Sequence, residues 1–174
     1  MAKHKQFDIE IDRLTRSIEN STTGDNFKTS VLEVTSKDIK ELKKSDWFFD
    51  WKTEAKQANT TVYKLVIADN PHIIQGLISL QDRGDHIFMQ LIESTKFNRG
   101  IKKVYFGVPE NLVAFVCKLA FEKGYSGYVS FESKTKLIAH YKKSLGAHIL
   151  FGKFMAIDTK AATGLVAQYF PEKL

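Results

Sequence analysis

The first sixty residues show strand-like and then helix-like patterns of hydrophobic positions. Residues 7–11 alternate apolar and charged side chains, which predicts a strand. A turn-rich stretch follows, and after it residues 28–34 show a second strand pattern. We therefore expect the strands at 7–11 and 28–34 to pair as a hairpin. Ser36 fits the N-cap of a helix, and a second short helix is predicted at residues 52–57. The aromatic run at residues 47–51 predicts core packing beneath the two helices, with the wall of a substrate pocket as the alternative.

The middle of the chain carries three consecutive strand patterns. They lie at residues 60–69, 73–81 and 86–94, are rich in apolar, β-branched and aromatic residues, and are separated by short turns. Strands joined by tight turns predict an antiparallel meander.

Helical spacing begins after residue 107 and then alternates with strand patterns. Pro109 suits the first turn of a helix, where its missing N–H has no intrahelical acceptor, and Gly124 suits the helix end. The remaining elements are predicted as a strand at 128–131, a helix at 134–145, a strand at 148–157 and a helix at 161–170.

The order of these elements defines the expected fold class. A strand–helix–strand crossover places the strands at 86–94 and 128–131 side by side and parallel. We therefore expect an α/β (α+β) fold with a mixed, mostly antiparallel central sheet of about six to seven strands, flanked by helices on both faces. Residues 7–174 are expected to form one domain after a disordered tail at residues 1–6.

Composition narrows the classes of protein that fit. The chain has 174 residues, 43% of them hydrophobic, and no apolar stretch approaches the ~20 residues needed to cross a bilayer. No apolar signal region follows the basic N-terminus, which predicts a cytoplasmic location and no membrane partner. Cys117 is the single cysteine, which excludes an internal disulfide, and the five histidines show no metal-ligand spacing, so no metal is expected.

The charge of the chain is compatible with an anionic ligand but does not select one. The formal net charge is +6, which suits nucleic acid, a phosphorylated cofactor or an anionic membrane surface. The lysines are scattered and mostly stand beside acidic residues, so solubility alone is the alternative explanation. The sequence lacks the motifs of P-loop kinases, α/β-hydrolases and Rossmann dehydrogenases, which makes these classes poor candidates.

Four segments carry a resemblance to a known family. They read Met89-Gln-Leu-Ile-Glu93, Gly107-Val-Pro-Glu-Asn-Leu112, Gly127-Tyr-Val-Ser-Phe131 and His140-Tyr-Lys-Lys-Ser-Leu-Gly146. Together with the order of elements, they resemble the central strand, phosphate loop, neighbouring strand and following helix of the GNAT N-acyltransferase superfamily, over residues 28–158. The family's loop reads Gln/Arg-x-x-Gly-x-Gly/Ala, whereas this chain has Val104, Gly107 and Pro109 at those positions, so only the middle glycine matches.

The resemblance implies acetyl-CoA as co-substrate, held in a slot where the two parallel strands diverge. Backbone groups of Leu91, Ile92 and Glu93 would pair with its pantetheine arm, and Ser130 or Ser133 would lie across the gap. Helix N-termini bind anions through backbone N–H groups and the helix dipole. The residues expected near the phosphates are Lys102, Lys103, Gly107, Val108, Glu110, Asn111 and Leu112.

Two residues are the candidates for proton transfer. Tyr141 occupies a position that resembles the family's general acid, and a phenol with a pKa of about 10 can protonate a leaving thiolate. Packing against the sheet is the structural alternative for this tyrosine. Glu93 ends an apolar strand and is the candidate general base, acting through water, with a solvent-facing place at the rim as the alternative. A backbone N–H near Ile92 or Glu93 would hold the oxyanion.

The function implied by the resemblance is transfer of acetyl from acetyl-CoA to a primary amine of a small molecule or a peptide. A non-catalytic module that binds CoA or a nucleotide on the same fold is the alternative, motivated by Val104 and Pro109. A nucleic-acid-associated protein ranks last, because the aromatic residues fall at core-like spacing. A homodimer through the apolar stretch at 149–169 remains open, with covering by the C-terminal helix as the equal alternative.

Overall fold

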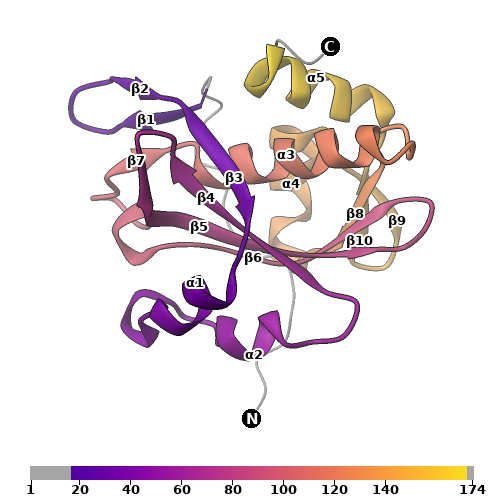
Figure 1. Cartoon of the computed structure of the whole chain (residues 1–174). Coiled ribbons are helices and arrows are strands. Elements are labelled where there is room, and N and C mark those ends of the chain that lie inside the picture. Colours follow the sequence, from indigo (N-terminus) through magenta and orange to yellow (C-terminus); the bar gives the residue numbers. More distant parts are fainter. Residues whose placement is uncertain (1–16, 172–174) are drawn as a thin grey trace.

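The computed structural model describes residues 17–171, so the predicted tail at 1–6 and the predicted strand at 7–11 lie outside the described residues. The described chain forms a seven-stranded sheet with the order β3-β4-β5-β6-β8-β10-β9 and a three-stranded sheet with the order β2-β1-β7 (Figure 1). The strands are β1 (Ile18–Asn20), β2 (Asn26–Phe27), β3 (Thr29–Glu33), β4 (Thr61–Ile67), β5 (Asn70–Asp82), β6 (Ile87–Ser94), β7 (Tyr105–Phe106), β8 (Val129–Glu132), β9 (His148–Phe151) and β10 (Phe154–Ile157). The helices are α1 (Ser36–Glu41), α2 (Trp51–Ala55), α3 (Val108–Glu122), α4 (Ile138–Leu145) and α5 (Thr159–Tyr169).

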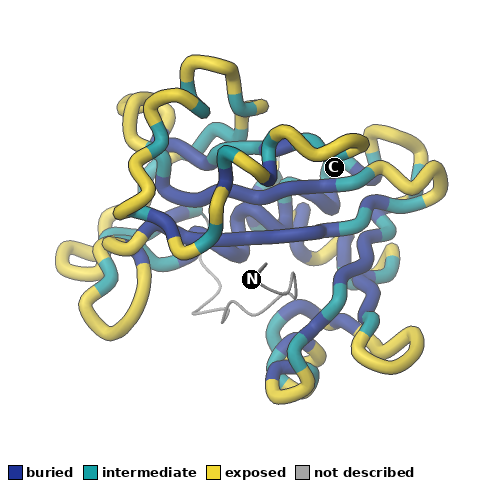
Figure 2. The backbone as a smooth tube through the Cα atoms, turned by 90° about the horizontal axis from the view of Figure 1, so that it is seen from below, coloured by how far each residue is buried: buried dark blue, intermediate teal, exposed yellow. Residues whose placement is uncertain are grey.

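Helices cover both faces of the large sheet, as predicted. α3 and α5 pack together over one face, whereas α1 and α2 lie against the other (Figure 1). The larger apolar cluster includes Ile78 of the sheet with Leu112 and Val116 of α3, all fully buried. The smaller cluster forms around Trp47 and Trp51. Burial runs along the central strands and is lost at the loops (Figure 2), so the strand ends are where a site can open to solvent.

The predicted meander and crossover are both confirmed. β4, β5 and β6 pair antiparallel in chain order. β6 then pairs parallel with β8, the strand that follows α3. The fold class is therefore α/β with a mixed sheet flanked by helices.

Capping chemistry sets the helix ends, with one correction at α1. Thr35, not Ser36, is the N-cap: its side chain accepts the Asp38 N–H, and the Asp38 carboxylate accepts the Thr35 N–H. This reciprocal pair satisfies two N–H groups that the helix itself cannot. α3 begins after Gly107, whose φ of 90° favours glycine, and has Pro109 in its first turn as predicted.

The turn around Gly24 joins β1 to β2, and β3 pairs with β4. The predicted pairing of residues 7–11 with residues 28–34 lies outside the described residues. Two other connections differ from the predictions. Residues 95–106, between the predicted strand at 86–94 and the helical spacing after residue 107, contain β7, which pairs with β1. The predicted single strand at 148–157 is a hairpin of β9 and β10, because the chain reverses at Gly152 with a φ of 53°.

The insertion of β10 between β8 and β9 leaves β9 at the edge of the sheet. Ile149, Leu150 and Phe151 of this strand are 42%, 44% and 66% exposed. The C-terminal helix therefore does not cover these side chains, and that alternative is wrong. A homodimer through this edge stays a prediction.

Candidate active site

A β-bulge in β6 marks the point where this strand leaves β8. Opposite β5, Met89 pairs with Leu80 and Leu91 pairs with Ser79, which leaves Gln90 as the extra residue. A bulge re-aims the side chains that follow it. Accordingly, Met89 lies in the larger apolar cluster and Leu91 in the smaller one on the opposite face.

Pairing between β6 and β8 ends at the bulge. The last pair in the described chain joins Met89 to Phe131, although β6 continues to Ser94. A strand that has left its neighbour presents backbone N–H and C=O groups to an extended ligand. β8 itself ends one residue later, at Glu132, so within the described residues the edge of β6 beyond Met89 is unpaired toward β8, and the slot between diverging strands stays a prediction.

A cavity of about 650 Å³ lies at this end of β6. Its walls come from the segment between α1 and α2, the end of β6, the loop that leads to β7 and the first turn of α3. The lining residues are Phe48, Phe49, Ile92, Glu93, Ser94, Asn98, Arg99, Gly100, Ile101, Lys103 and Pro109. Three of the residues predicted from the sequence are thus brought together here: Ile92, Glu93 and Lys103.

The carboxylate of Glu93 joins three segments of the cavity wall. Its Oε1 accepts the Phe49 N–H at 3.1 Å and the Trp51 indole N–H at 2.8 Å. Its Oε2 accepts the Phe48 N–H at 2.6 Å and a guanidinium N–H of Arg99 at 2.7 Å. The residue is only 4% exposed, so the solvent-facing alternative for Glu93 is wrong.

A second buried carboxylate lies on the same face of the sheet but not among the lining residues. Glu54 of α2 is 3% exposed and accepts the Ser79 hydroxyl at 2.8 Å and the side-chain amide of Gln90. This network connects α2 to β5 and to the bulge of β6. The α1–α2 side of the sheet is therefore attached through two carboxylates, one beneath α2 and one at the cavity.

The first turn of α3 corrects the list of predicted phosphate donors. The Asn111 N–H donates to the Gly107 carbonyl inside the helix at 3.0 Å, and the Asn111 side-chain oxygen accepts the Thr29 hydroxyl at 3.2 Å. Leu112 is fully buried in the larger apolar cluster, and its N–H lies two residues beyond that of Glu110, the last N–H that the helix leaves without an internal acceptor. The backbone N–H of Asn111 is therefore used inside the helix, and a role of its side-chain amide or of Leu112 toward a phosphate stays a prediction.

The other predicted residues near the helix start differ in exposure. Val108 and Glu110 are fully buried, and their N–H groups belong to the first turn. Lys102 is exposed, whereas Lys103 lines the cavity. Gly107 makes the helix entry possible through its positive φ. Their roles toward a phosphate stay predictions.

Tyr141 and Ser133 lie outside the cavity lining. The Tyr141 ring is fully buried and meets Phe131 edge-to-face at a centroid distance of 5.4 Å. Ser133 is also fully buried, and its hydroxyl donates to the Lys134 carbonyl. The packing predicted as the alternative for Tyr141 is therefore present, and its role as an acid stays a prediction.

Sequence reasoning did not single out several residues of the cavity. Arg99 belongs to the loop between β6 and β7, which we call the basic loop because it also holds Lys96, Lys102 and Lys103, but its bond to Glu93 could not be inferred from the sequence of that loop. Trp47 and Trp51 are core, which confirms the core-packing interpretation for these two residues. Phe48 and Phe49 line the cavity, and their role as the wall of a substrate pocket stays a prediction.

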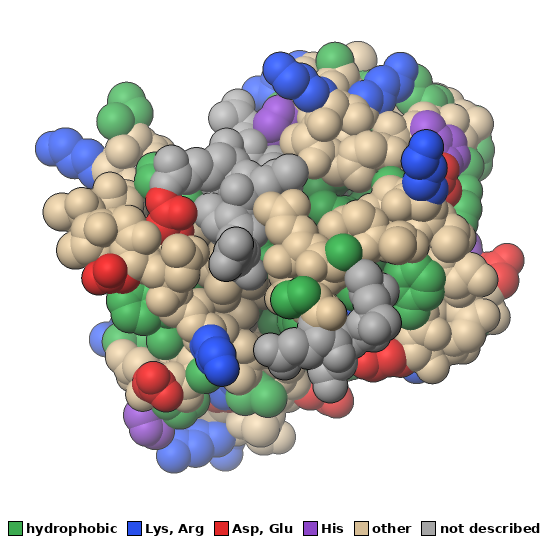
Figure 3. Space-filling view, turned by 90° about the horizontal axis from the view of Figure 1, so that it is seen from above, with side chains coloured by type: hydrophobic (Ala, Val, Ile, Leu, Met, Phe, Trp, Pro, Cys, Tyr) green, Lys and Arg blue, Asp and Glu red, His purple; other side chains and the backbone are tan. Residues whose placement is uncertain are grey.

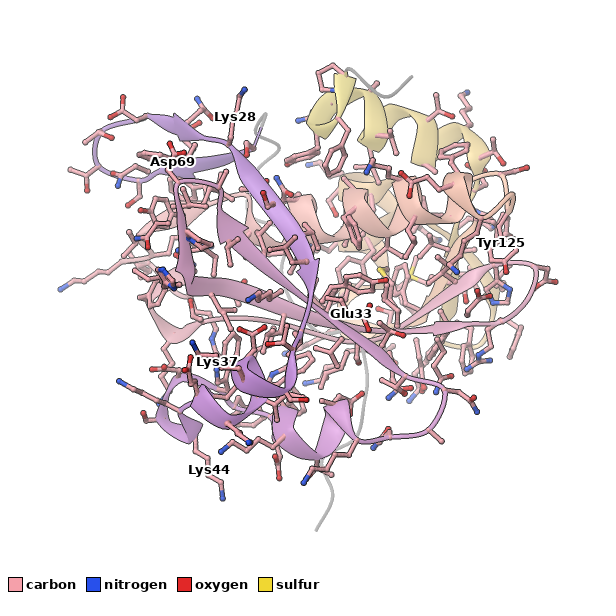
Figure 4. All side chains as sticks on the ribbon, in the orientation of Figure 1. Lys28, Glu33, Lys37, Lys44, Asp69 and Tyr125 are labelled. Carbon is pink, nitrogen blue, oxygen red and sulfur yellow. The ribbon has the colours of Figure 1, made fainter. Side chains whose placement is uncertain are left out.

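Another ionic cluster lies at the far end of the same strands. Tyr125, labelled in Figure 4, donates to Asp82 at 2.8 Å, and Lys123 lies 3.2 Å from the same carboxylate. The Gly84 N–H, followed by these two side chains, lowers the pKa of Asp82. The hydrogen bond to Asp82 in turn raises the pKa of Tyr125. Asp82 ends β5 next to the start of β6, so this cluster is separate from the cavity at Ser94.

Four other features of the described residues bear on function: metal ligands, membrane-spanning helices, the single thiol and the surface charge. Residues 17–171 contain no group of three His, Cys, Asp or Glu side chains arranged to hold a metal ion. None of the helices described there is long and apolar enough to span a membrane. Burial raises the pKa of the Cys117 thiol to about 12. Basic and acidic side chains are interspersed over the face seen in Figure 3, without a single basic patch on that face.

Comparison with known proteins extends the description of the fold. No protein-family model matches the chain, and no curated protein matches it. The KacTA–DNA complex is similar in structure, with a TM-score of 0.58 and 16% identity, covering 80% of this chain and 99% of that chain. AtaTR bound with acetyl-CoA has a TM-score of 0.54 and 13% identity, covering 79% and 98%. A mutant AtaT toxin bound to the C-terminus of the antitoxin AtaR and acetyl-CoA has a TM-score of 0.51 and 12% identity, also covering 79% and 98%.

Identities this low establish a common fold and no more. The match rests on an α/β fold with a mixed sheet flanked by helices. The chain has the fold of the GNAT N-acyltransferases.

Proposed function

We propose that this protein transfers an acetyl group from acetyl-CoA to a primary amine. The observation that carries the proposal is the open edge of β6 beyond the Met89–Phe131 pair, beside a cavity of about 650 Å³. Two of the similar structures contain acetyl-CoA, which supports the choice of acetyl donor.

The residues at the edge of β6 fit acetyl-CoA in two respects. The backbone from Gln90 to Ser94 has the extended form that pairs with a pantetheine arm. The start of α3 and Lys103 supply positive potential for phosphates at one end of the cavity. Pro109 removes one N–H from that first turn, so we expect Lys103 to carry more of the phosphate binding than a lysine beside a complete glycine loop would.

Acetyl transfer needs an uncharged amine at the thioester carbon and a proton for the leaving thiolate. We propose Tyr141 as the proton donor, on the strength of its position in the fold. A backbone N–H at Ile92 or Glu93 is proposed to stabilise the oxyanion. The acceptor amine would enter from the Phe48–Phe49 side, where the cavity wall is aromatic.

Binding and turnover are tested separately. Acetyl-CoA at 100 times its Kd is expected to stabilise the protein by about 2.7 kcal/mol through mass action, and therefore to raise the melting temperature. CoA release is then followed with a thiol reagent over a panel that contains an amino acid amide, a short peptide with a free N-terminus and a diamine. No thermal shift at millimolar acetyl-CoA would contradict the proposal, and binding without CoA release over the panel would favour the non-catalytic alternative.

Replacement of the proposed acid provides the decisive variant. Tyr141→Phe removes the hydroxyl and keeps the ring that packs on Phe131, so turnover should fall about 10²–10⁴-fold while the acetyl-CoA thermal shift is retained. Tyr169→Phe is the matched control, because Tyr169 is also buried but belongs to α5. Equal turnover in the two variants would remove Tyr141 from the mechanism.

A further inference from the structure

We propose that Glu93 is a positioning residue of the acetyl-transfer site rather than its general base. In this role its carboxylate holds the wall of Phe48 and Phe49 and the guanidinium of Arg99 in the arrangement that forms the cavity. The inference rests on the proposed function and names how one side of that site is built.

The hydrogen bonds of Glu93 leave no position for a proton acceptor. An ionised carboxylate has two oxygens and about four acceptor positions. Both oxygens accept two bonds each, from Phe48, Phe49, Trp51 and Arg99. A general base needs a lone pair within reach of the proton that it removes. Releasing one here would require movement of a backbone amide, the indole or the guanidinium.

Burial holds only part of the aromatic wall, because Phe49 packs against the smaller apolar cluster of Trp47 and Trp51 whereas Phe48 does not. The segment between α1 and α2 contains only one short 3-10 turn, at residues 44–46. Phe48 is 57% exposed, and its ring meets the Phe49 ring edge-to-face at 5.1 Å. The backbone N–H groups of both residues converge on Glu93. The wall therefore has a polar anchor on β6, Glu93, in addition to the apolar packing of Phe49.

The basic loop is attached to the same carboxylate from the other side. Arg99 is 38% exposed in its side chain and lines the cavity, and its bond to Glu93 is 2.7 Å long. A guanidinium carries five N–H donors in a rigid plane, so one bond to a buried acceptor sets the direction of the others. Arg99 also compensates the negative charge that Glu93 places in the interior. Loss of the carboxylate would release the wall and the loop together.

Hydrogen exchange tests the positioning role without turnover. In Glu93→Gln, we expect amide exchange in the peptide that covers residues 47–51 to accelerate about 10-fold or more, because two amides lose a charged acceptor. Glu54→Gln is the matched control: it neutralises an equally buried carboxylate on the same sheet face that does not line the cavity, and it should leave exchange at 47–51 unchanged. Unchanged exchange in Glu93→Gln would overturn the proposal.

Steady-state kinetics distinguish a positioning residue from a base. With whichever panel amine the wild type acetylates best, Glu93→Gln should raise KM for the amine about 10-fold or more and keep the shape of the kcat/KM pH profile. A general base would give a different set of results in Glu93→Gln: kcat would fall about 10²–10⁴-fold at wild-type KM, the acid limb of the pH profile would be lost, and amide exchange would stay as in the wild type. These results together would overturn the proposal.

A second variant covers a failure of Glu93→Gln to fold. Arg99→Met removes one of the four donors at a half-exposed side chain, and we expect a higher KM for the amine with kcat within about twofold of wild type. Wild-type KM in Arg99→Met would then overturn the proposal. If no amine is acetylated, the proposed function fails, whereas the exchange experiment still decides the role of Glu93.

Discussion

Gly76→Ala should destabilise the fold, although it adds only one methyl group. Gly76 lies in β5 opposite Ser94 of β6, where the first turns of α3 approach the sheet. A Cβ there would lie 2.8 Å from Val108 Cγ1, 3.1 Å from Leu112 Cδ1 and 3.3 Å from the Glu93 carbonyl oxygen. Val108 and Leu112 are fully buried, so neither can give way without displacing its neighbours.

The expected cost follows from overpacking. One extra methyl group in a well-packed core costs about 1–3 kcal/mol in the free energy of unfolding. For a chain of this size each kcal/mol corresponds to about 2–4 °C in the melting temperature. Since Val108 opens α3, the same displacement should weaken acetyl-CoA binding at the helix start.

Gly164→Ala is the control, with the opposite expected sign. Gly164 lies in α5 and does not have a positive φ, and a Cβ there would meet no atom of another element within 4 Å. Alanine there restricts the unfolded chain and suits the helix, so we expect a gain of about 0.4–1 kcal/mol.

Urea unfolding of the two variants measures both effects. The midpoint should fall for Gly76→Ala and rise for Gly164→Ala at an unchanged m-value. A Gly76→Ala protein as stable as wild type would refute the close-approach argument, as would a shift of both variants in the same direction.

Three further predictions follow from buried or exposed side chains. Because burial raises the pKa of Cys117 to about 12, a thiol reagent should label it only after unfolding, and rapid labelling of the native protein would contradict this. Burial pushes the pKa of Asp38 up, but hydrogen bonds from Lys64 and Thr35 outweigh it and lower that pKa. Asp38→Asn should therefore lower the free energy of unfolding by about 1–2 kcal/mol at pH 7. The difference from wild type should vanish as the pH falls below about 4, through the folded-state pKa of Asp38. Urea unfolding at a series of pH values measures this difference, and a pH-independent difference would contradict the prediction. If β9 pairs with a second copy, light scattering should find a dimer that Phe151→Lys dissociates, since Phe151 is 66% exposed; a monomeric wild type would exclude this interface.

The types and order of most elements could be predicted from the sequence. The β-rich runs between residues 60 and 94 are the meander, and Pro109 marks the first turn of α3. Gly146 ends α4 with a φ of 66°, as a glycine after a helical pattern indicates. These features depend on side-chain periodicity and local backbone sterics, which act within a few residues of the chain.

Local sequence patterns could not decide between two local structures that have the same pattern of residues. Residues 148–157 are β-like throughout, and only the turn at Gly152 separates β9 from β10. Thr35 and Ser36 are both suitable N-caps, and the bond to Asp38 decides between them. The bulge at Gln90 leaves no mark in the alternation of β6, because the residues that follow it are buried on both faces.

The sequence by itself determined the strand–helix–strand frame and the residues Glu93 and Lys103 that stand at its opening. Only the tertiary structure decided what Glu93 contacts. Its partners Phe48 and Trp51 lie 45 and 42 residues away in the chain, on the other side of two strands. Hydrogen bonds between segments so far apart depend on how the layers pack, since no local periodicity relates one loop to the strand end that it meets.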